Sequence, residues 1–181
     1  CTTRKNMNIE EVTQKSIIAI YPDSFMLPLL GKGDFEILKL IRNPKSLSNY
    51  ISDVSQGDFN LSTFKNKYSN KVTNVKLLRG DNISDYHVNY SVNEFVNNDF
   101  RTEYVKDNKK NTYILAQAIT GTTDKKRLHF ALSDVNESFL CGHSINKILL
   151  KNDDQLLVIL GILNSKLIDW TFRKTSTNNN A

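Results

Sequence analysis

The chain has 181 residues, with 24 Lys and Arg against 19 Asp and Glu, a formal net charge of +5, and 39% hydrophobic residues. These values fit one folded domain with a helical arm and exclude a disordered chain, while two cysteines are too few for a disulfide scaffold. No run approaches the roughly 20 apolar residues of a membrane span, and residues 2–12 lack the apolar block of a signal peptide. The chain begins with Cys1 rather than Met, so we expect a fragment of a longer, cytoplasmic protein with reduced thiols, Cys141 being buried.

Two helices are predicted in the N-terminal part of the chain. Residues 9–20 form the first, which ends before Pro22 because a proline disfavours helix in the residue preceding it. Residues 25–30 are short and apolar, so they predict a strand or a buried loop. A second helix starts at Asp34, the expected N-cap, and places an apolar stripe on one face, namely Phe35, Leu38, Ile41 and, less regularly, Ile37.

Alternating apolar and polar residues predict strands through the middle of the chain. The expected strands are residues 50–54, 72–78, 86–92, 112–119 and 127–132, with one or two more within 139–150. Gly-containing turns follow the first two of them, at residues 56–58 and 79–82, and a polar excursion covers residues 97–110.

A longer helix is predicted near the C-terminus. Asn152 or Asp153 caps it, and its large apolar side chains recur at helical spacing: Leu156, Leu160, Leu163, Leu167 and Trp170. This stripe is expected to pack on a partner surface. The fold class is therefore α+β, a mixed and mainly antiparallel sheet bracketed by N-terminal and C-terminal helices.

Familiar catalytic patterns are absent from the sequence. It has no phosphate-binding loop, no dinucleotide fingerprint and no nucleophile elbow, and its three histidines do not have metal-ligand spacing. Asp107 and Asp124 each precede a lysine in the manner of a metal-dependent nuclease, but both lie in hydrophilic segments without a preceding acidic strand. We therefore expect no catalytic residue, metal or cofactor in this chain.

Hydrogen-bond donors near predicted strand ends are the remaining chemical signal. Lys125, Lys126 and Arg127 follow a Gly-Thr loop that could contact phosphate, and Arg79 stands beside Gly80, where it could reach a base edge or a phosphate. The alternative interpretation is a solvated loop with Arg79 in a surface ion pair with Asp81 or Asp85.

Four segments, in order, resemble one known family. Residues 35–58, with the helix followed by Val54-Ser55-Gln56-Gly57-Asp58, resemble the start of a DNA target-recognition domain. Leu77-Leu78-Arg79-Gly80 with the aromatic Tyr86 is similar to its next segment, as are residues 114–120 with Lys126-Arg127-Leu128. Leu163-Asn164-Ser165-Lys166 is similar to its most specific helix motif. The family is the TaqI-like C-terminal specificity domain of restriction–modification enzymes, and the resemblance covers residues 35–178; one departure is Ala118, where members often carry Arg after the Gln.

The resemblance implies a bacterial, cytoplasmic domain that catalyses no reaction itself. It would read a short sequence of double-stranded DNA and position an upstream adenine-N6 DNA methyltransferase domain, which would use S-adenosylmethionine, in a parent that is possibly also an endonuclease. Residues 1–32 would be a helical arm, 33–178 the recognition domain and 179–181 a disordered tail. The candidate DNA contacts are Gln56, Asn60, Arg79, Asn82, Gln117, Thr120, Thr122, Lys125, Lys126 and Arg127.

Within that set, Arg79 and Gln117 are the candidates for base reading, and Lys125 and Lys126 for phosphate. Asn164 and Ser165 are expected to be structural. Two alternatives stay open: a non-enzymatic protein-interaction module that uses the stripe from Leu156 to Trp170, and a compact hydrolase or nuclease that depends on Asp107 or Asp124.

Overall fold

A computed structural model describes residues 13–20, 30, 33–41, 46–73, 75–100, 111–121 and 124–175. Its helices are α1 (Gln14–Ile20), α2 (Asp34–Ile41), α4 (Leu156–Leu163) and α5 (Lys166–Thr175), with 3-10 turns η1 (Leu47–Asn49), η2 (Lys65–Lys67) and η3 (Gly80–Asn82). Its strands are β1 (Ile51–Gln56), β2 (Tyr68–Ser69), β3 (Val75–Leu78), β4 (Ile83–Ser84), β5 (His87–Val88), β6 (Phe95–Val96), β7 (Ile114–Gln117), β8 (Phe130–Leu132), β9 (Phe139–Cys141) and β10 (Ile145–Leu150).

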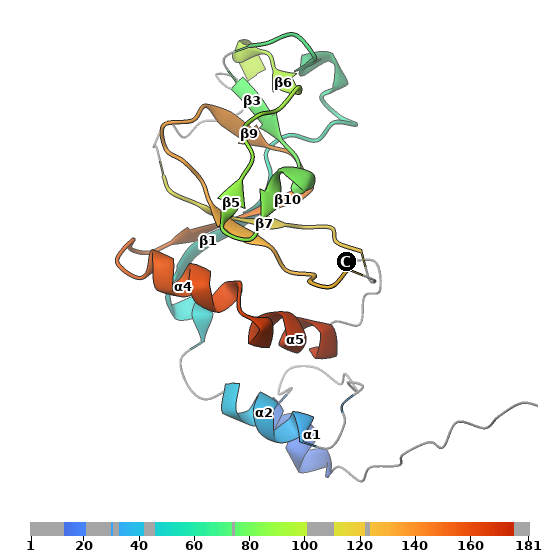
Figure 1. The fold of residues 1–181 in the computed structure, drawn as a ribbon, viewed down its shortest axis with the longest axis vertical. Helices are drawn as coiled ribbons and strands as arrows, with labels where there is room; N and C mark the ends of the chain where they lie inside the picture. The colour runs from blue at the N-terminus through green and yellow to red at the C-terminus, as the bar shows by residue number, and fades with distance from the viewer. Residues whose placement is uncertain are drawn as a thin grey trace, which may run out of the picture.

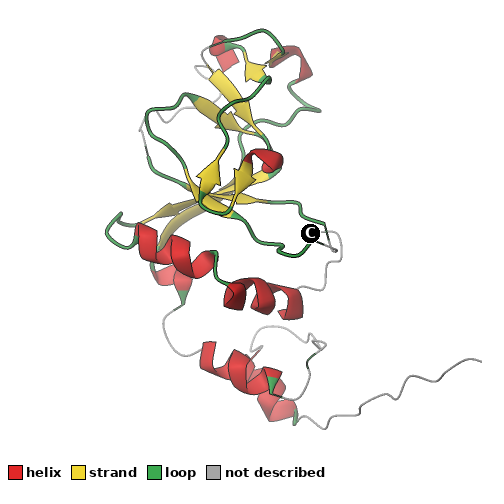
Figure 2. Ribbon diagram, in the orientation of Figure 1, coloured by secondary structure: helices red, strands yellow, loops and turns green. Residues whose placement is uncertain are grey.

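The strands form two four-stranded sheets and a hairpin. One sheet has the order β1-β10-β7-β8, the other has the order β2-β6-β3-β9, and β4 pairs with β5. All pairs between these strands are antiparallel except β3 with β9. Helices α4 and α5 lie beneath the first sheet, and α1 and α2 lie beyond them at the lower end of the molecule (Figures 1 and 2). The predicted α+β class, with mainly antiparallel sheet and helices towards both ends, is confirmed.

Three apolar clusters explain this layering. Helix α4 packs on one face of the first sheet through Leu156, Leu160 and Leu163, against strand residues such as Ile114 and Ile148. The opposite face of the same sheet meets the hairpin and the β3–β9 edge of the second sheet, through Leu115, Ala131, Ile145, Leu78, Val88 and Cys141. A third cluster under the second sheet contains three rings that stack edge to face or tilted: Phe59, Phe64 and Phe100.

Trp170 connects the N-terminal helices to the rest of the described chain. It packs on the small cluster formed by Ile20 of α1 and Leu38 of α2, and Lys174 pairs with Asp34 at 2.8 Å. The predicted helix at residues 34–41 is confirmed, although Asp34 is its first residue rather than its cap. Helix α1 confirms residues 14–20 of the first predicted helix; residues 9–12, 25–29 and 101–110 lie outside the described residues, and the domain boundaries stay predictions.

The strand prediction for residues 86–92 is wrong in its extent. Tyr86 lies in the turn of the β4–β5 hairpin with φ 64°, and only residues 87–88 pair as strand. The alternation arose because Val88, Tyr90 and Val92 all pack on the same cluster, although the backbone after Val88 leaves the ladder. Periodic burial therefore occurred without sheet pairing.

The single C-terminal helix is also a wrong prediction, because it is two helices. Gln155 rather than Asn152 or Asp153 stands at the start of α4. The break falls at Asn164 and Ser165, where the Ser165 hydroxyl accepts a hydrogen bond from the Ile168 N–H at 3.3 Å and so caps α5. Because the break rotates the second helix, Leu167 is 48% exposed while Asp169 is buried.

The interaction-module alternative required a free apolar stripe, and the structure contradicts that requirement. Leu156, Leu160 and Leu163 are buried against this chain's own sheet. Cys141 is buried as predicted, and burial raises the pKa of its thiol to about 12. Within the part of the chain that the structure describes, every helix is too short or too polar to span a bilayer.

Candidate functional site

Four polar turns that are distant in sequence meet where the two sheets adjoin. We call this site the turn junction and define it as residues 56–58, 79–82, 117–118 and 142–144. The Gly142 N–H donates to the Leu78 carbonyl at 2.9 Å, and the Gly57 N–H donates to the Ile145 carbonyl at 2.8 Å. The Ala118 N–H, which directly follows β7, donates to the Ser144 carbonyl at 2.9 Å. These three bonds join the ends of β1, β3 and β7 to β10 and to the connection that precedes it.

Glycine is required at the turn junction because backbones approach closely there. A Cβ added to Gly57 would lie 2.1 Å from the Gly142 carbonyl oxygen and 2.5 Å from that of Cys141. A Cβ on Gly80 would lie 3.0 Å from the Ser144 carbonyl oxygen. The Gly-containing turns seen in the sequence are therefore packing sites that bring neighbouring polar side chains together.

Three predicted contact residues use part of their polar groups to build the turn junction. The Gln56 amide Nε2 donates to the His143 carbonyl at 2.7 Å, and the Asn82 Oδ1 accepts from the Arg79 N–H at 2.7 Å. The Arg79 Nε pairs with Glu94 at 2.7 Å, so the expected partner Asp81 or Asp85 is wrong and the ion pair is with the residue that directly precedes β6.

Gln117 differs from those three. It lies at the end of β7, half-buried, with its Cγ next to Gly80, and its carboxamide has no hydrogen-bond partner among the described residues. Asn60 follows the junction, and its Oδ1 accepts from the Ser62 N–H at 3.0 Å in a tight turn. Gln117 is thus the predicted base-reading residue whose polar group is most available.

The second predicted group lies on the connection from β7 to β8, beneath the turn junction. Thr120 is half-buried, Lys125 is exposed without a partner among the described residues, and Thr122 lies outside them. The Asp124 carboxylate closes this loop by accepting from the Gly121 N–H at 2.8 Å. Lys125 is therefore available to an external anion.

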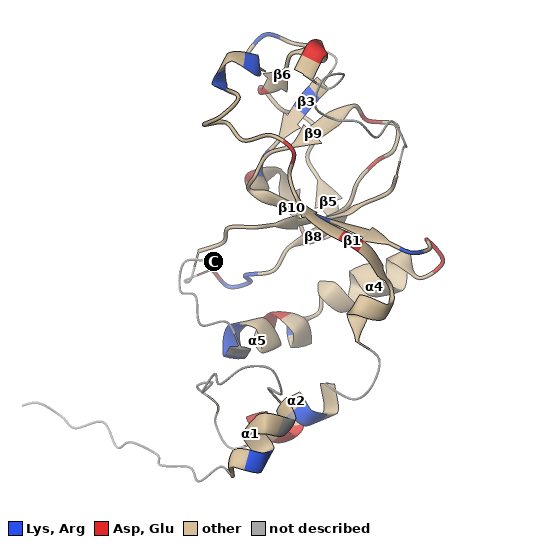
Figure 3. Cartoon of the chain, turned by 180° about the vertical axis from the view of Figure 1, so that it is seen from behind, with Lys and Arg blue, Asp and Glu red and all other residues tan. Residues whose placement is uncertain are grey.

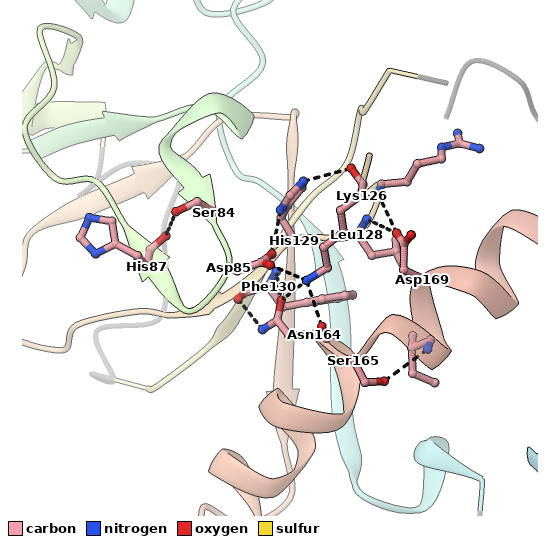
Figure 4. Close-up of polar contacts among 12 residues, drawn as sticks. Ser84, Asp85, His87, Lys126, Leu128, His129, Phe130, Asn164, Ser165 and Asp169 are labelled. Atoms are coloured by element: carbon pink, nitrogen blue, oxygen red, sulfur yellow. Dashed lines mark hydrogen bonds and ion pairs between the residues drawn. The ribbon is translucent and has the colours of Figure 1, made fainter. Parts of the chain in front are cut away.

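Lys126 is instead held inside the protein (Figure 4). Its ammonium contacts Asp85 Oδ2 at 2.6 Å, the Asn164 carbonyl at 3.0 Å and the Asn164 Oδ1 at 3.3 Å. The His129 ring lies between the other Asp85 oxygen, at 2.8 Å, and the Lys126 carbonyl. These contacts join the β4–β5 hairpin to the C-terminal end of α4, so Lys126 has a structural role whether or not it also contacts phosphate.

Arg127 is buried, with 6% of its surface exposed. Its guanidinium lies over the Phe172 ring at 5.1 Å, and its Nε and Nη2 are buried with no hydrogen-bond partner among the described residues. Burying two guanidinium nitrogens without acceptors is costly, and the aromatic face offsets only part of that cost. Most of the Arg127 side chain is therefore inside the protein, and its predicted contact with DNA stays a prediction.

The side chains of Asn164 and Asp169 hydrogen-bond backbone groups in and just before β8, the edge strand of the first sheet (Figure 4). The Asn164 carboxamide donates to the Phe130 carbonyl at 2.8 Å and accepts from its N–H at 3.2 Å, in the manner of a neighbouring strand. Asp169 Oδ1 accepts from the N–H groups of Arg127 and Leu128 at 2.7 and 3.0 Å. The prediction that Asn164 and Ser165 are structural is thereby confirmed.

Asp169 has a lowered carboxyl pKa. Burial alone would raise the pKa, but the hydrogen bonds from Arg173 and from the Arg127 and Leu128 N–H groups outweigh it. The Arg173 guanidinium donates to Asp169 Oδ2 at 2.8 Å and to the Asp124 carbonyl at 2.7 Å. The carboxylate thus stays ionised while it holds the backbone before β8.

Positive charge is dispersed over the described chain. Several cations are paired, among them Lys67 with Asp99, Lys76 with Glu137 and Lys147 with Asp58. The exposed lysines without a partner among the described residues are Lys15, Lys39, Lys65, Lys71, Lys125 and Lys166. They belong to both ends of the molecule and to its middle, and Figure 3 likewise shows Lys and Arg dispersed along the chain.

The sequence analysis missed His143 and Ser144. The Ser144 hydroxyl accepts from the Gly80 N–H at 2.9 Å, and its carbonyl accepts from the Ala118 N–H at 2.9 Å. The signal available was Gly142 between two predicted strands, which marks a turn of the same kind as Gly57 and Gly80. In the part of the chain that is described, no three His, Cys, Asp or Glu residues gather as metal ligands would.

The fold and site together define an α+β domain that presents polar side chains on turns fixed by close backbone packing. Residues 75–181 match the family described as the TaqI-like C-terminal specificity domain. The chain therefore belongs to this family of specificity domains of restriction–modification enzymes. A comparison with curated proteins found no match.

Proposed function

We propose that this chain recognises a specific sequence in double-stranded DNA and positions the methyltransferase domain of an adenine-N6 restriction–modification enzyme. The observation that carries the proposal is the family match over residues 75–181. The proposal assigns no bond-making step to this chain, places S-adenosylmethionine in the methyltransferase domain, and places the protein in the bacterial cytoplasm. Fusion of the parent methyltransferase to an endonuclease is a second, independent proposal, and DNA recognition by this chain does not depend on it.

The geometry of the turn junction supports base recognition. Discrimination between bases requires donors and acceptors held in a fixed position, because a misplaced group loses the hydrogen bond to the correct base. Gln56, Arg79 and Asn82 have their backbone or side chain fixed by bonds of 2.7 Å, and Gln117 extends beside them with its carboxamide free in the described structure. Gln117 is suited to the two hydrogen bonds that a carboxamide makes to adenine in the major groove.

Affinity is expected to come from exposed cations. A lysine that contacts a phosphate releases condensed counterions. Each such contact therefore steepens the plot of the logarithm of the binding constant against the logarithm of the salt concentration by about 1. Lys125 is the best candidate because it is exposed and without a partner among the described residues. Lys126 has an internal partner in Asp85, so its replacement also loosens the hairpin.

The experiment is a selection of random duplexes on the full chain at two salt concentrations. An enriched short motif, with affinity that falls steeply as salt rises, supports the proposal. Lys125→Ala should lower the salt slope by about 1 on every sequence, and Gln117→Ala should cost about 1–3 kcal/mol at one base pair. Lys166→Ala is the matched lysine control. Absence of any preferred duplex at low salt would contradict the proposed function.

A further inference from the structure

His143 is an exposed residue of the turn junction whose side chain has no structural role among the described residues. It lies in the connection between β9 and β10, its side chain is exposed, and its ring has no partner among the described residues. An exposed imidazole offers one ring N–H donor and one ring acceptor when neutral. Its position and its free ring atoms both suit recognition of a ligand.

The backbone around His143 is held from several directions. The His143 N–H donates to the Phe59 carbonyl at 3.1 Å, and its carbonyl accepts from Gln56 Nε2 at 2.7 Å. On either side, Gly142 and Ser144 are bonded to Leu78, Gly80 and Ala118. Because the backbone polar groups of His143 are already used, a ligand at this turn meets the imidazole, which is presented from a rigid support.

Charge at the turn junction favours a base edge over a phosphate. Arg79 is neutralised by Glu94 at 2.7 Å, and Lys147, on β10, is neutralised by Asp58 at 2.6 Å. Asp81 is exposed and adds a negative charge beside Gly80. A phosphate would meet no uncompensated lysine or arginine among these described residues, whereas a neutral purine edge offers N7 or O6 to a ring N–H.

We propose that His143 reads a purine of the recognised DNA site by donating a ring N–H to its major-groove edge, with Gln56 as the positioning residue that fixes the turn. This inference rests on the proposed function. It adds His143 as a specificity-determining residue to the side chains of the turn junction that are proposed to meet the DNA.

The test uses the full chain and the duplex that the selection identifies. Each purine of that duplex is replaced in turn by its 7-deaza analogue, which has no N7 acceptor, and by the other three bases. His143→Ala should lower discrimination at one purine by about 5- to 150-fold, the range of a good base contact, and leave affinity for unrelated duplexes within about twofold. The base substitutions should show that loss whether the acceptor is N7 or O6. If the acceptor is N7, the 7-deaza analogue should weaken wild-type binding at that purine but not binding by the variant.

Gln56→Met tests the positioning role, because it removes the Nε2 donor and keeps the side-chain length. It should reduce discrimination at the same purine as His143→Ala, and the double variant should be no worse than His143→Ala alone. His87→Ala, on the β4–β5 hairpin, is the matched control, since His87 is equally an exposed histidine. Melting temperatures of all variants verify that folding is unchanged.

The outcomes separate the two proposals. A uniform loss on all duplexes, or an unchanged profile in His143→Ala while the wild type remains selective, overturns the role of His143 alone. Discrimination lost at a different purine in Gln56→Met overturns the positioning role. A wild type without any sequence preference overturns the proposed function and this inference with it.

Discussion

Asn164 is expected to be the most important single polar residue for the stability of the described fold. Its side chain is 7% exposed and makes four hydrogen bonds, to both backbone groups of Phe130, to the Leu160 carbonyl and to Lys126. In Asn164→Ala the Phe130 carbonyl keeps the Tyr86 N–H at 2.9 Å, and Lys126 keeps Asp85. The Phe130 N–H, however, is left buried with no partner in the described structure.

The magnitude follows from that one orphaned donor. A buried unsatisfied N–H costs about 1–3 kcal/mol, and the small cavity adds to it, so the free energy of unfolding should fall by about 2–4 kcal/mol. For a chain of this size the melting temperature should fall by about 4–16 °C. Asn164→Asp keeps the volume but faces the Phe130 carbonyl with an oxygen, so it should cost a comparable amount.

The assay is urea denaturation followed by circular dichroism, with each variant compared at equal protein concentration. Ser165→Ala is the control from the same helix break, because its hydroxyl accepts a single 3.3 Å bond at a half-buried position. It should cost about 1 kcal/mol or less. A loss below about 1 kcal/mol in Asn164→Ala would refute the argument that this carboxamide closes the sheet edge.

Three further predictions concern stability. The stability that the Asp169 carboxylate contributes should be fully present above its unfolded pKa of about 4 and be lost as the pH falls through the lowered folded pKa. In acid titrations, the difference in unfolding free energy between wild type and Asp169→Asn should therefore shrink below about pH 4. A difference independent of pH would contradict this. Gly57→Ala should destabilise by about 3 kcal/mol or more in denaturant, because its Cβ meets backbone oxygens, whereas Gly161→Ala, in a helix with open space around it, should stabilise by about 1 kcal/mol; equal effects would rule out the close approach. Arg127→Met should raise the unfolding free energy by about 1 kcal/mol, since it removes two buried donors that have no acceptor among the described residues, and a marked loss in calorimetry would mean that the guanidinium has partners.

Local patterns predicted those elements whose sequences alternate or form an apolar run or stripe and whose ends carry clear signals. Strands β1, β7 and β10 follow alternation or apolar runs, and α2 follows an apolar stripe. The same reasoning failed for residues 86–92, because Tyr90 and Val92 are half-buried from a backbone that is not in a sheet. It failed again at Asn164, where the helix breaks between α4 and α5. The helical spacing of apolar residues continues across this break, whereas the Asn164 bond to the Phe130 carbonyl that accompanies it is a tertiary contact.

The candidate site was predicted in part for the same reason. Gln56, Arg79, Asn82 and Gln117 stand next to strand ends or glycines, which are local signals, and the structure brings all four to the turn junction. Their pairing with Glu94 and with the carbonyl of His143 depends on segments up to 87 residues away in the chain, which no local pattern contains.

The sequence by itself was enough to predict a folded α+β domain and the approximate position of most strands. It also carried the family resemblance that the match to residues 75–181 confirms. Only the tertiary structure decided which charged residues are available to a ligand. Lys125 and Lys126 are neighbours of the same type, yet one is exposed and the other is bonded to Asp85 and Asn164. The physical reason is that burial and pairing depend on which distant segments pack together, whereas residue type and spacing record only local chemistry.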